Sequence, residues 1–481
     1  MKRLVCISNR VWLPRRSAAA PGGLAVGVLA ALQRTGGMWF GWSGETSDDP
    51  RPEPEVLVRD NIRFATVELK SGQFERYYNG FCNSTLWPLF HYATGRFRYE
   101  NEDYEAYQAV NTQLARQLEK LLRPDDVLWV HDYHLIPLAR NLRQSQFRGP
   151  IGFFLHIPFP PLQVLRVLPS YGEILRDLCH YDLVGFQTDD DLRAFESCLE
   201  LPPHAITRAP NGVRIESGGR SVRLGIYPIG VEADQAASEA ATATAEETVQ
   251  RLIASLLGRK LIIGVDRLDY TKGLTERFAA FEQFLSTFPD SQGKVTFLQI
   301  APLSRSDVLA YSEIRLALEQ TAGRLNGRFA EADWTPVRYL NRNFSHATLM
   351  GLLRASSVAL VTPVRDGMNL VAKEFVAAQA AEDPGVLILS PLAGAARELT
   401  GALLVNPYDK RGLALALQTA LHMPLAERRE RHAQMLEAVR RHDIHNWYRE
   451  FLRDLTGERF IGSGSDPTPF NKAAVRSATA R

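Results

Sequence analysis

The sequence predicts an α/β fold made of two doubly wound domains in tandem. Short buried strands alternate with helical stretches, this alternation restarts in the second half, and 481 residues amount to about three domains at roughly 150 residues each. Apolar residues make up 45% of the chain and charged residues 23%, which provides for large cores under a charged surface. This composition excludes a chain that is disordered, collagen-like or coiled-coil throughout.

The first half contains four candidate strands, each followed by a polar or helical segment. The buried run at 3–8 leads through an irregular loop at 11–20 to Pro21-Gly22-Gly23 and a helical stretch at 24–32. Further buried runs follow at 127–130, 151–155 and 183–186. Strands that alternate with helices in this way are typical of a parallel sheet.

The second half repeats the pattern. Its candidate strands are 260–265, 296–301, 358–362, 385–389 and 402–405. The turn-rich Ile226-Tyr227-Pro228-Ile229-Gly230 predicts a hinge, and the Ala-rich stretch after it, 233–248, can form a helix. We therefore expect domains at 1–230 and 231–455, a ligand cleft between the carboxyl ends of their strands, and a disordered Gly/Ser/Pro-rich tail at 462–481.

The overall charge directs attention to local anion sites. Fifty-six Lys and Arg against 54 Asp and Glu leave +2, so no global field recruits nucleic acid or an anionic membrane. The four cysteines form no CxxC pair, and no window of 18 or more apolar residues or secretion signal is present. We expect a cytoplasmic protein that binds neither nucleic acid nor membrane.

Two cations follow the strand at 260–265 directly. Arg267 and Lys272 lie five residues apart at the expected edge of the cleft, and a diphosphate supplies the charges to satisfy both. Charge-assisted hydrogen bonds contribute about 1.5–3 kcal/mol each, so loss of either cation should weaken binding about ten- to a hundredfold. The alternative is a surface ion pair with Asp269 or Glu276.

A second anion site is predicted after the strand at 358–362. The segment from Asp366 to Glu374 leads into a helix, so its backbone N–H groups and the positive helix end favour a negative ligand. Glu374 is suited to accept hydrogen bonds from ribose hydroxyls, although a lone Glu in a helix is more often a surface charge.

The first half supplies residues suited to a phosphorylated sugar. The guanidinium group of arginine holds phosphate through paired hydrogen bonds, aromatic faces pack on a sugar ring, and a carboxylate accepts hydrogen bonds from the sugar hydroxyls. The candidates are Arg10, Tyr78, Trp87 and Asp132, with Arg305 from the second half. His131 and His134 could bind a metal, but no third ligand is spaced to join them.

Two common nucleotide motifs are absent from the sequence. No GxGxxG follows the first strand, since Gly22, Gly23 and Gly27 have a different spacing, and no GxxxxGK[ST] occurs. The absence of both motifs argues against a dinucleotide oxidoreductase and against a P-loop kinase. It does not argue against a nucleotide-sugar site, which needs neither motif.

Over residues 1–455 the chain resembles the trehalose-6-phosphate synthases, which are retaining glycosyltransferases. The motifs that carry this resemblance are Ser8-Asn9-Arg10, Gly22-Gly23-Leu24, Trp39-Phe40-Gly41-Trp42-Ser43-Gly44, Tyr77-Tyr78-Asn79, Leu86-Trp87-Pro88, Trp129-Val130-His131-Asp132-Tyr133-His134, His156-Ile157-Pro158-Phe159-Pro160, Arg267 to Gly273 and Arg365 to Glu374. The resemblance implies the GT-B arrangement, in which two Rossmann-like domains face each other across a deep cleft, with a last helix that crosses back to the first domain. It also implies UDP-glucose and glucose 6-phosphate as substrates, with no metal and no other cofactor.

The resemblance assigns roles residue by residue. It implies a donor set of Gly22, Gly23, Arg267, Lys272, Phe344, Asp366, Gly367, Met368, Asn369, Leu370, Val371, Ala372, Lys373 and Glu374. It implies an acceptor set of Arg10, Tyr78, Trp87, Asp132 and Arg305, and a catalytic group of His156, Asp132, Arg267 and Lys272. The Arg-rich loop 11–20 and the tail 462–481 depart from the family pattern, and a homodimer or homotetramer is left open.

Retention at the donor carbon needs either a double displacement through a carboxylate or a same-face attack in which the leaving phosphate takes the acceptor proton. We favour the same-face route because the sequence provides cations for the leaving group and places no Asp or Glu behind the anomeric carbon. The alternatives are a same-fold transferase with another acceptor, such as a glucosylglycerol-phosphate synthase or a cyclitol pseudoglycosyltransferase, and a non-catalytic sugar-phosphate sensor. ADP- or GDP-glucose could also bind to Arg267 and Lys272, the two cations that we call the diphosphate clamp.

Overall fold

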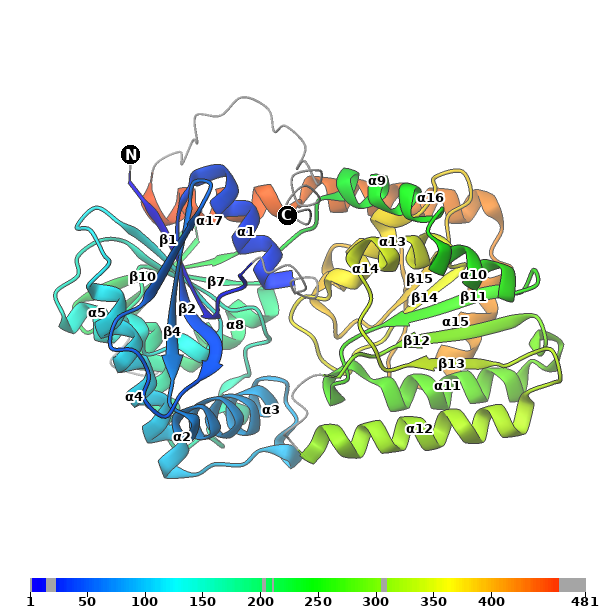
Figure 1. Ribbon diagram of the computed structural model, residues 1–481, viewed down its shortest axis with the longest axis horizontal. Helices are drawn as coiled ribbons and strands as arrows, with labels where there is room; N and C mark the ends of the chain where they lie inside the picture. Colours follow the sequence, from blue (N-terminus) through cyan, green and yellow to red (C-terminus); the bar gives the residue numbers. More distant parts are fainter. Residues whose placement is uncertain (1, 14–22, 201–204, 210–211, 304–308, 458–481) are drawn as a thin grey trace, which may run out of the picture.

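The computed structural model describes residues 2–13, 23–200, 205–209, 212–303 and 309–457. Figure 1 shows two lobes side by side, one coloured blue to cyan and the other green to yellow, each with a sheet flanked by helices. Gly22, Arg305, most of the loop 11–20 and the tail 462–481 lie outside the described residues.

The first lobe contains a ten-stranded sheet in the order β3-β4-β2-β1-β5-β6-β7-β10-β9-β8. The strands from β4 to β10 in this order pair in parallel, and β3, β9 and β8 add antiparallel edges. The strands are β1 (Leu4–Arg10), β2 (Gly37–Thr46), β3 (Glu55–Arg59), β4 (Ile62–Leu69), β5 (Val127–His131), β6 (Ile151–Phe154), β7 (Leu183–Phe186), β8 (Ala205–Ala209), β9 (Gly212–Ser217) and β10 (Arg220–Ile226).

The second lobe contains a six-stranded, all-parallel sheet in the order β13-β12-β11-β14-β15-β16. Its strands are β11 (Lys260–Val265), β12 (Val295–Ile300), β13 (Val337–Leu340), β14 (Val358–Val361), β15 (Val386–Leu389) and β16 (Leu403–Leu404). Helices separate most of them, as parallel strands require crossover connections.

The helices of the first lobe are α1 (Gly23–Thr35), α2 (Ser71–Phe74), the π-helix η1 (Glu75–Leu86), α3 (Trp87–Phe90), η2 (Thr94–Arg96), α4 (Asn101–Glu119), η3 (Tyr133–Leu135), α5 (Leu138–Gln144), α6 (Leu162–Leu165), α7 (Tyr171–Leu178) and α8 (Asp189–Cys198). The later helices are α9 (Ala233–Ala243), α10 (Glu247–Ser255), η4 (Tyr270–Lys272), α11 (Leu274–Thr287), η5 (Pro289–Ser291), α12 (Leu309–Phe329), α13 (His346–Arg354), α14 (Leu370–Ala378), η6 (Gly394–Arg397), α15 (Lys410–His422), α16 (Leu425–Arg441) and α17 (Ile444–Thr456).

The apolar runs of the sequence form the buried strands. All nine predicted strands are present, with ends that differ by at most two residues. The sequence patterns missed β2, β3, β4, β8, β9, β10 and β13. In β2, Gly41 lies so close to β1 that a Cβ atom there would be 2.0 Å from the carbonyl oxygen of Ser8, so only glycine fits. Glycine does not contribute to an apolar pattern, which is one reason why the sequence did not predict this strand.

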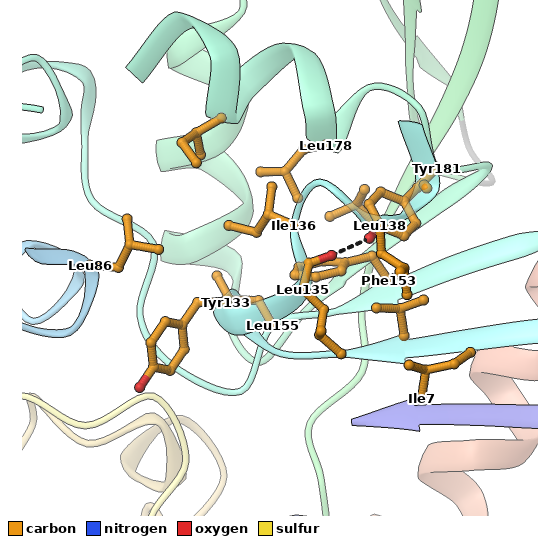
Figure 2. Close-up of a cluster of buried hydrophobic side chains, with 14 of the residues drawn as sticks. Ile7, Leu86, Tyr133, Leu135, Ile136, Leu138, Phe153, Leu155, Leu178 and Tyr181 are labelled. Atoms are coloured by element: carbon orange, nitrogen blue, oxygen red, sulfur yellow. Dashed lines mark hydrogen bonds between the residues drawn. The ribbon is translucent and has the colours of Figure 1, made fainter. Parts of the chain in front are cut away.

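Apolar side chains pack tightly behind the turn that follows β5. Figure 2 shows Tyr133, Leu135 and Ile136 from this turn among Phe153 and Leu155 of the neighbouring strand region. The hydroxyls of Tyr107 and Tyr181 donate to the carbonyls of Tyr133 (2.7 Å) and Leu135 (2.8 Å). These buried hydrogen bonds hold the end of β5 in one position, and Asp132 lies on this turn.

The last described helix, α17, returns to the first lobe. Figure 1 shows it in orange-red beside α1, and Trp447 and Phe451 pack on Trp129 of β5 with ring centroids 4.7 and 4.9 Å apart. A Cβ atom at Gly152 of β6 would lie 2.6 Å from the ring of Phe451, so glycine leaves the room that this ring occupies. One of the two apolar clusters of the first lobe is therefore completed by α17.

The segment between the lobes is held by a buried ionic group. The ammonium of Lys373 donates to the carbonyl of Ile229 (2.8 Å) and pairs with Glu398 (2.6 Å), which also contacts His442 (2.8 Å). Gly230 packs so closely on the chain before α17 that a Cβ atom would lie 1.9 Å from the carbonyl oxygen of His442. These contacts tie the connection between the lobes to α14 and to the entry of α17.

Candidate active site

The predicted site residues lie at the carboxyl ends of parallel strands. Arg10 ends β1, Asp132 follows β5, and His156 lies two residues after β6. In the second sheet Arg267 lies two residues after β11, and Asp366 lies in the loop between β14 and α14, five residues after the strand. Open α/β sheets bind ligands at these edges, and here the edges of two sheets meet.

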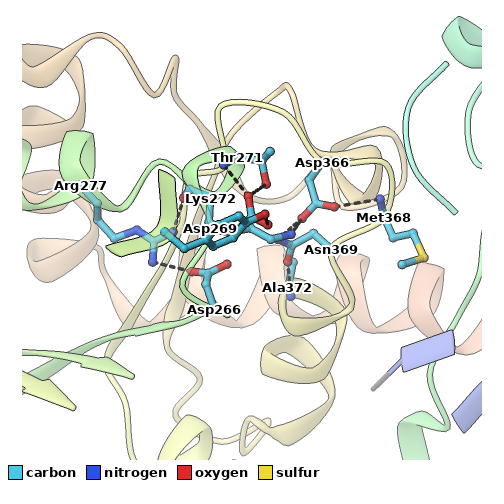
Figure 3. A network of polar contacts seen from close by, with 10 residues as sticks. Asp266, Asp269, Thr271, Lys272, Arg277, Asp366, Met368, Asn369 and Ala372 are labelled. Carbon is cyan, nitrogen blue, oxygen red and sulfur yellow. Dashed lines mark hydrogen bonds and ion pairs between the residues drawn. The ribbon is translucent and has the colours of Figure 1, made fainter. Parts of the chain in front are cut away.

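Lys272 and Asp366 form the centre of the predicted donor set. The ammonium of Lys272 lies 2.5 Å from Oδ2 of Asp366, and the amide of Asn369 donates to the same oxygen at 3.1 Å (Figure 3). Burial alone would raise the pKa of Asp366, but Lys272 and the hydrogen bonds outweigh it and hold this pKa below its usual value. Asp366 is therefore a fixed anion, and Lys272 keeps two N–H groups for a ligand.

Buried polar pairs hold the β11–α11 segment in place. Arg277 is fully buried and donates to Asp266 (2.7 Å), a pair that Figure 3 shows, and also to Gln299 (2.9 Å) and Thr362 (3.1 Å). Asp269 accepts from the backbone N–H and the hydroxyl of Thr271, both at 2.9 Å. Lys272 thus extends from a turn that cannot shift without breaking these bonds.

The loop from Asp366 to Asn369 leads into α14 through a left-handed residue. Asn369 has a φ of 74°, and its side chain accepts from the backbone N–H of Ala372 at 3.1 Å. This cap uses one of the N–H groups that the sequence assigned to an anion, and Leu370 and Val371 form the first turn of the helix. The side chain of Leu370 touches Gly23, where a Cβ atom would lie 2.4 Å away, so α14 contacts the start of α1 in the other lobe.

Lys373 and Glu374 point to different partners. The ammonium of Lys373 is buried against Ile229 and Glu398, so only the backbone of this residue is free to face a donor. Glu374 lies 3.6 Å from Nε2 of His346, whose Nδ1 lies 2.9 Å from Glu239. His346 therefore orients the carboxylate that the sequence predicts to bind ribose, while Phe344, two residues earlier, packs under the guanidinium of Arg342 at 4.5 Å.

We expect His346→Gln to destabilise the protein in a pH-dependent way. Hydrogen bonds to Glu239 and then Glu374 raise the pKa of His346 from 6.5 to about 10. The imidazolium therefore stabilises the fold fully below pH 6.5, and this contribution is lost as the pH rises through about 10. Because the side chain is partly exposed, the difference in unfolding free energy should be about 0.5–1 kcal/mol at pH 6 and vanish above pH 10.

Urea unfolding of both proteins between pH 6 and pH 10.5 measures this difference. The matched control is His422→Gln, because His422 is exposed and its Nδ1 contacts the carbonyl of Gln418 instead of a carboxylate. A wild-type advantage that grew with pH would contradict the assignment.

Aromatic rings form the wall beside Arg10. The guanidinium of Arg10 lies 5.9 Å from the ring of Trp42, which lies 6.1 Å from the ring of Tyr78. Tyr78 also stacks on Phe74 and His134 at 5.2 and 5.8 Å. This arrangement offers a cation next to flat apolar surface, as a sugar phosphate requires. Trp42 belongs to the tryptophan-rich motif of the sequence, but its spacing gave it no role.

Asp132 is held in a strained conformation at the end of β5. Its φ is 77°, a left-handed value that few residues other than glycine adopt, and Oδ1 accepts the backbone N–H of His156 at 3.2 Å. The carboxylate thus bridges the ends of β5 and β6. Burial lowers the pKa of His156 to about 3, so this imidazole is neutral.

The two lobes touch through residues of both predicted sets. The guanidinium of Arg267 lies 6.0 Å from the ring of Trp87, and the sulfur of Met368 lies 3.4 Å from Nδ1 of His156. Gly367 packs on the chain after β6, where a Cβ atom would be 2.6 Å from the carbonyl oxygen of His156. The structure therefore brings the donor and acceptor sets together, apart from Gly22 and Arg305.

A cavity of about 390 Å³ lies beside η4 and is lined by residues of both lobes. Its lining includes Arg96 of the first lobe and Tyr270, Glu276, Glu313 and Tyr408 of the second, and none of its lining residues belongs to the predicted sets. Sequence reasoning also missed His91, whose Nδ1 lies 2.8 Å from the carbonyl of Trp87. Burial lowers the pKa of His91 to about 4, and no spacing in the sequence marks it.

Among the described residues, no group of three or more His, Cys, Asp or Glu side chains could hold a metal ion. None of the helices in the described ranges is long and apolar enough to cross a bilayer.

The site and the two sheets define a sugar-transferring enzyme, and comparison with known proteins agrees. The family model for glycosyltransferase family 20 matches residues 10–457. The chain is 50% identical over 455 residues to the trehalose-6-phosphate synthase of Cronobacter sakazakii, with 95% of each chain covered. The chain belongs to glycosyltransferase family 20.

Solved structures give the same result. An α,α-trehalose-phosphate synthase (UDP-forming) from Burkholderia xenovorans, in complex with glucose-6-phosphate, is 50% identical and superposes with a TM-score of 0.91 over 95% of this chain and 100% of that one. The E. coli protein bound to UDP-2-fluoro glucose is 46% identical, with a TM-score of 0.89 over 94% and 99%. The predicted GT-B fold and the predicted glycosyltransferase class are confirmed.

Proposed function

We propose that this enzyme transfers glucose from UDP-glucose to glucose 6-phosphate, with retention of configuration, and forms α,α-trehalose 6-phosphate and UDP. The observation that carries the proposal is the contact between lobes, in which Arg267 of the diphosphate clamp lies against Trp87 and Met368 lies against His156. A donor bound on the second lobe and an acceptor bound on the first would meet there. The relatives bound to glucose-6-phosphate and to UDP-2-fluoro glucose support both substrates.

The cations account for departure of the leaving group. Arg267 and Lys272 would bind the diphosphate, and their charge offsets the negative charge that develops as the bond to the anomeric carbon breaks. Asp366, fixed by Lys272 and Asn369, would accept hydroxyls of the donor glucose, and Glu374 would accept those of ribose.

The first lobe would align the acceptor. Arg10 and Arg305 would hold the 6-phosphate, Tyr78 and Trp87 would pack on the sugar, and Asp132 would accept its hydroxyls. We propose a same-face attack in which the leaving phosphate takes the acceptor proton, so no covalent glycosyl-enzyme forms. Isolation of such an adduct would exclude this route.

The test is nucleoside diphosphate release from UDP-, ADP- and GDP-glucose with glucose 6-phosphate, glycerol 3-phosphate or no acceptor, followed by identification of the product. Release from UDP-glucose that depends on glucose 6-phosphate and yields an α,α-linked disaccharide phosphate supports the proposal. Release that occurs only with glycerol 3-phosphate would agree with diphosphate binding by Arg267 and Lys272 but would contradict glucose 6-phosphate as the acceptor. Absence of release with every donor would favour a non-catalytic sugar-phosphate sensor.

We further propose that the reaction needs no metal or other cofactor and takes place in the cytoplasm. The supporting observation is that the predicted clamp relies on Arg267 and Lys272 for positive charge. Release that is unchanged after treatment with a chelator is the expected result. A rate restored only by added Mg²⁺ or Mn²⁺ would contradict it.

A further inference from the structure

Two buried histidines lie in contact beneath the site, and the predicted catalytic group includes only one of them, His156. His131 ends β5, and its Nδ1 lies 3.2 Å from Nε2 of His156. Both residues are almost fully buried, at 0% and 2% exposed. The opposite nitrogen of His156, Nδ1, lies 3.4 Å from the sulfur of Met368 on the other lobe.

Both imidazoles are neutral, so one must donate and the other accept. Burial lowers the pKa of His131 well below its usual value, with the neighbouring His156 as a second cause, and burial lowers the pKa of His156 to about 3. A neutral imidazole carries one N–H and one bare nitrogen. The direction of the hydrogen bond therefore decides which nitrogen of His156 carries its proton.

The surroundings of His131 favour one direction. Within the described part of the chain, its Nε2 is buried without a hydrogen-bond partner. If His156 donated, the proton of His131 would lie on Nε2 as a buried, unpaired N–H, and such groups are rarer than unpaired acceptors. The two indoles packed on His131, Trp129 (4.5 Å) and Trp447 (6.0 Å), are donors only and could not accept it.

We propose that His131 is a positioning residue: its Nδ1–H donates to Nε2 of His156 and thereby keeps the proton of His156 on Nδ1, which faces the donor loop. This inference rests on the proposed function, and it takes His156 of the predicted catalytic group to be the residue that donates to the donor sugar near the anomeric centre. The sulfur of Met368 is a weak acceptor, so a sugar oxygen can replace it at little cost. Aromatic rings at Trp129, Phe154 and Trp447 keep both imidazoles from turning away.

The test compares His131→Leu with His131→Asn in the full-length protein. Leucine removes the donor, so His156 can populate both tautomers, and kcat should fall about ten- to a hundredfold while the KM for the donor changes by less than about threefold. Asparagine can present an amide N–H where Nδ1 lies, so its kcat should stay within about threefold of the wild type. Equal losses in both variants would overturn the proposal, because a packing role alone predicts them.

A second readout does not depend on transfer. Nitrogen-15 NMR of selectively labelled histidines assigns the proton of each neutral ring. We expect His156 to carry it on Nδ1 in the wild type and in His131→Asn, and on both nitrogens in His131→Leu. A proton on Nε2 of His156 in the wild type would overturn the inference even if transfer is confirmed, and an inactive wild type would overturn the function alone.

The matched control is His180→Leu. His180 is half-buried and contacts a backbone carbonyl, that of Arg176 at 2.8 Å, and it lies just before β7, at the edge of the sheet opposite to the two sets. This variant should not show the selective loss of kcat. If His131→Leu fails to fold, the wild-type and His131→Asn spectra still decide the question.

Discussion

Replacing Lys272 with methionine is expected to lower kcat/KM for UDP-glucose by at least about a hundredfold, because it removes a charge-assisted bond to the diphosphate and unbalances Asp366. Asp366 is 8% exposed and would keep only the weaker support of Asn369 (3.1 Å) and the N–H of Met368 (3.4 Å). Its pKa should rise, since Lys272 is the largest influence that lowers it against burial. Steady-state kinetics with varied donor measures the loss.

The same change should cost stability in a pH-dependent manner. A carboxyl whose pKa is lowered by folding stabilises the protein above its unfolded pKa and loses that contribution as the pH falls. The difference from the wild type should therefore be about 3 kcal/mol at pH 7 and shrink toward pH 3. The control is Lys410→Met, an exposed lysine at the start of α15, which should change neither quantity. Unchanged donor kinetics in Lys272→Met would refute the diphosphate clamp.

Replacing Arg277 with methionine is expected to destabilise the protein by about 3–5 kcal/mol, because it leaves the buried carboxylate of Asp266 without its cation. Arg277 is fully buried, and Gln299 and Thr362 would also lose their donor. Burial already raises the pKa of Asp266, and loss of Arg277 should raise it further. The folded state then holds a proton more tightly than the unfolded state, so the variant should lose stability as the pH rises.

Equilibrium urea unfolding at pH 5 and pH 8 measures both effects. The double variant Arg277→Met/Asp266→Asn should recover part of the loss, because no buried charge is then left unpaired. The control is Arg315→Met, which breaks an exposed pair with Glu319 (2.7 Å) and should leave the stability almost unchanged. Equal costs for Arg277→Met and Arg315→Met would show that burial adds nothing to the pair.

The sequence predicted the strands whose apolar residues are contiguous. Runs such as Lys260–Val265 and Leu183–Phe186 are buried on both faces of a parallel sheet and therefore show a continuous signal. The strand β3 (Glu55–Arg59) is exposed along its whole length, and β2 contains glycines that only close pairing with β1 explains. Their places in the sheet depend on partners far away in the chain, which local periodicity does not show.

The candidate site shows the same limit. Arg267, Lys272 and Asp366 could be predicted because each follows a strand that the sequence marks. The inward direction of Lys373, by contrast, depends on Ile229 and Glu398, and the pairing of His131 with His156 depends on the register of β5 and β6. Sequence spacing treated His131 as a weak metal ligand, whereas its neighbour in space is another histidine.

The return of α17 to the first lobe has a consequence for synthesis on the ribosome. Trp447 and Phe451 complete an apolar cluster that otherwise draws mainly on α1 and on strands of the first sheet, all of which are translated long before α17. At about 5–20 residues per second, the roughly 220 residues between β10 and α17 delay this packing by some 10–40 seconds. During that interval the apolar side chains of this cluster lack Trp447 and Phe451 as partners, so we expect the nascent first lobe to depend on chaperones until α17 is synthesised.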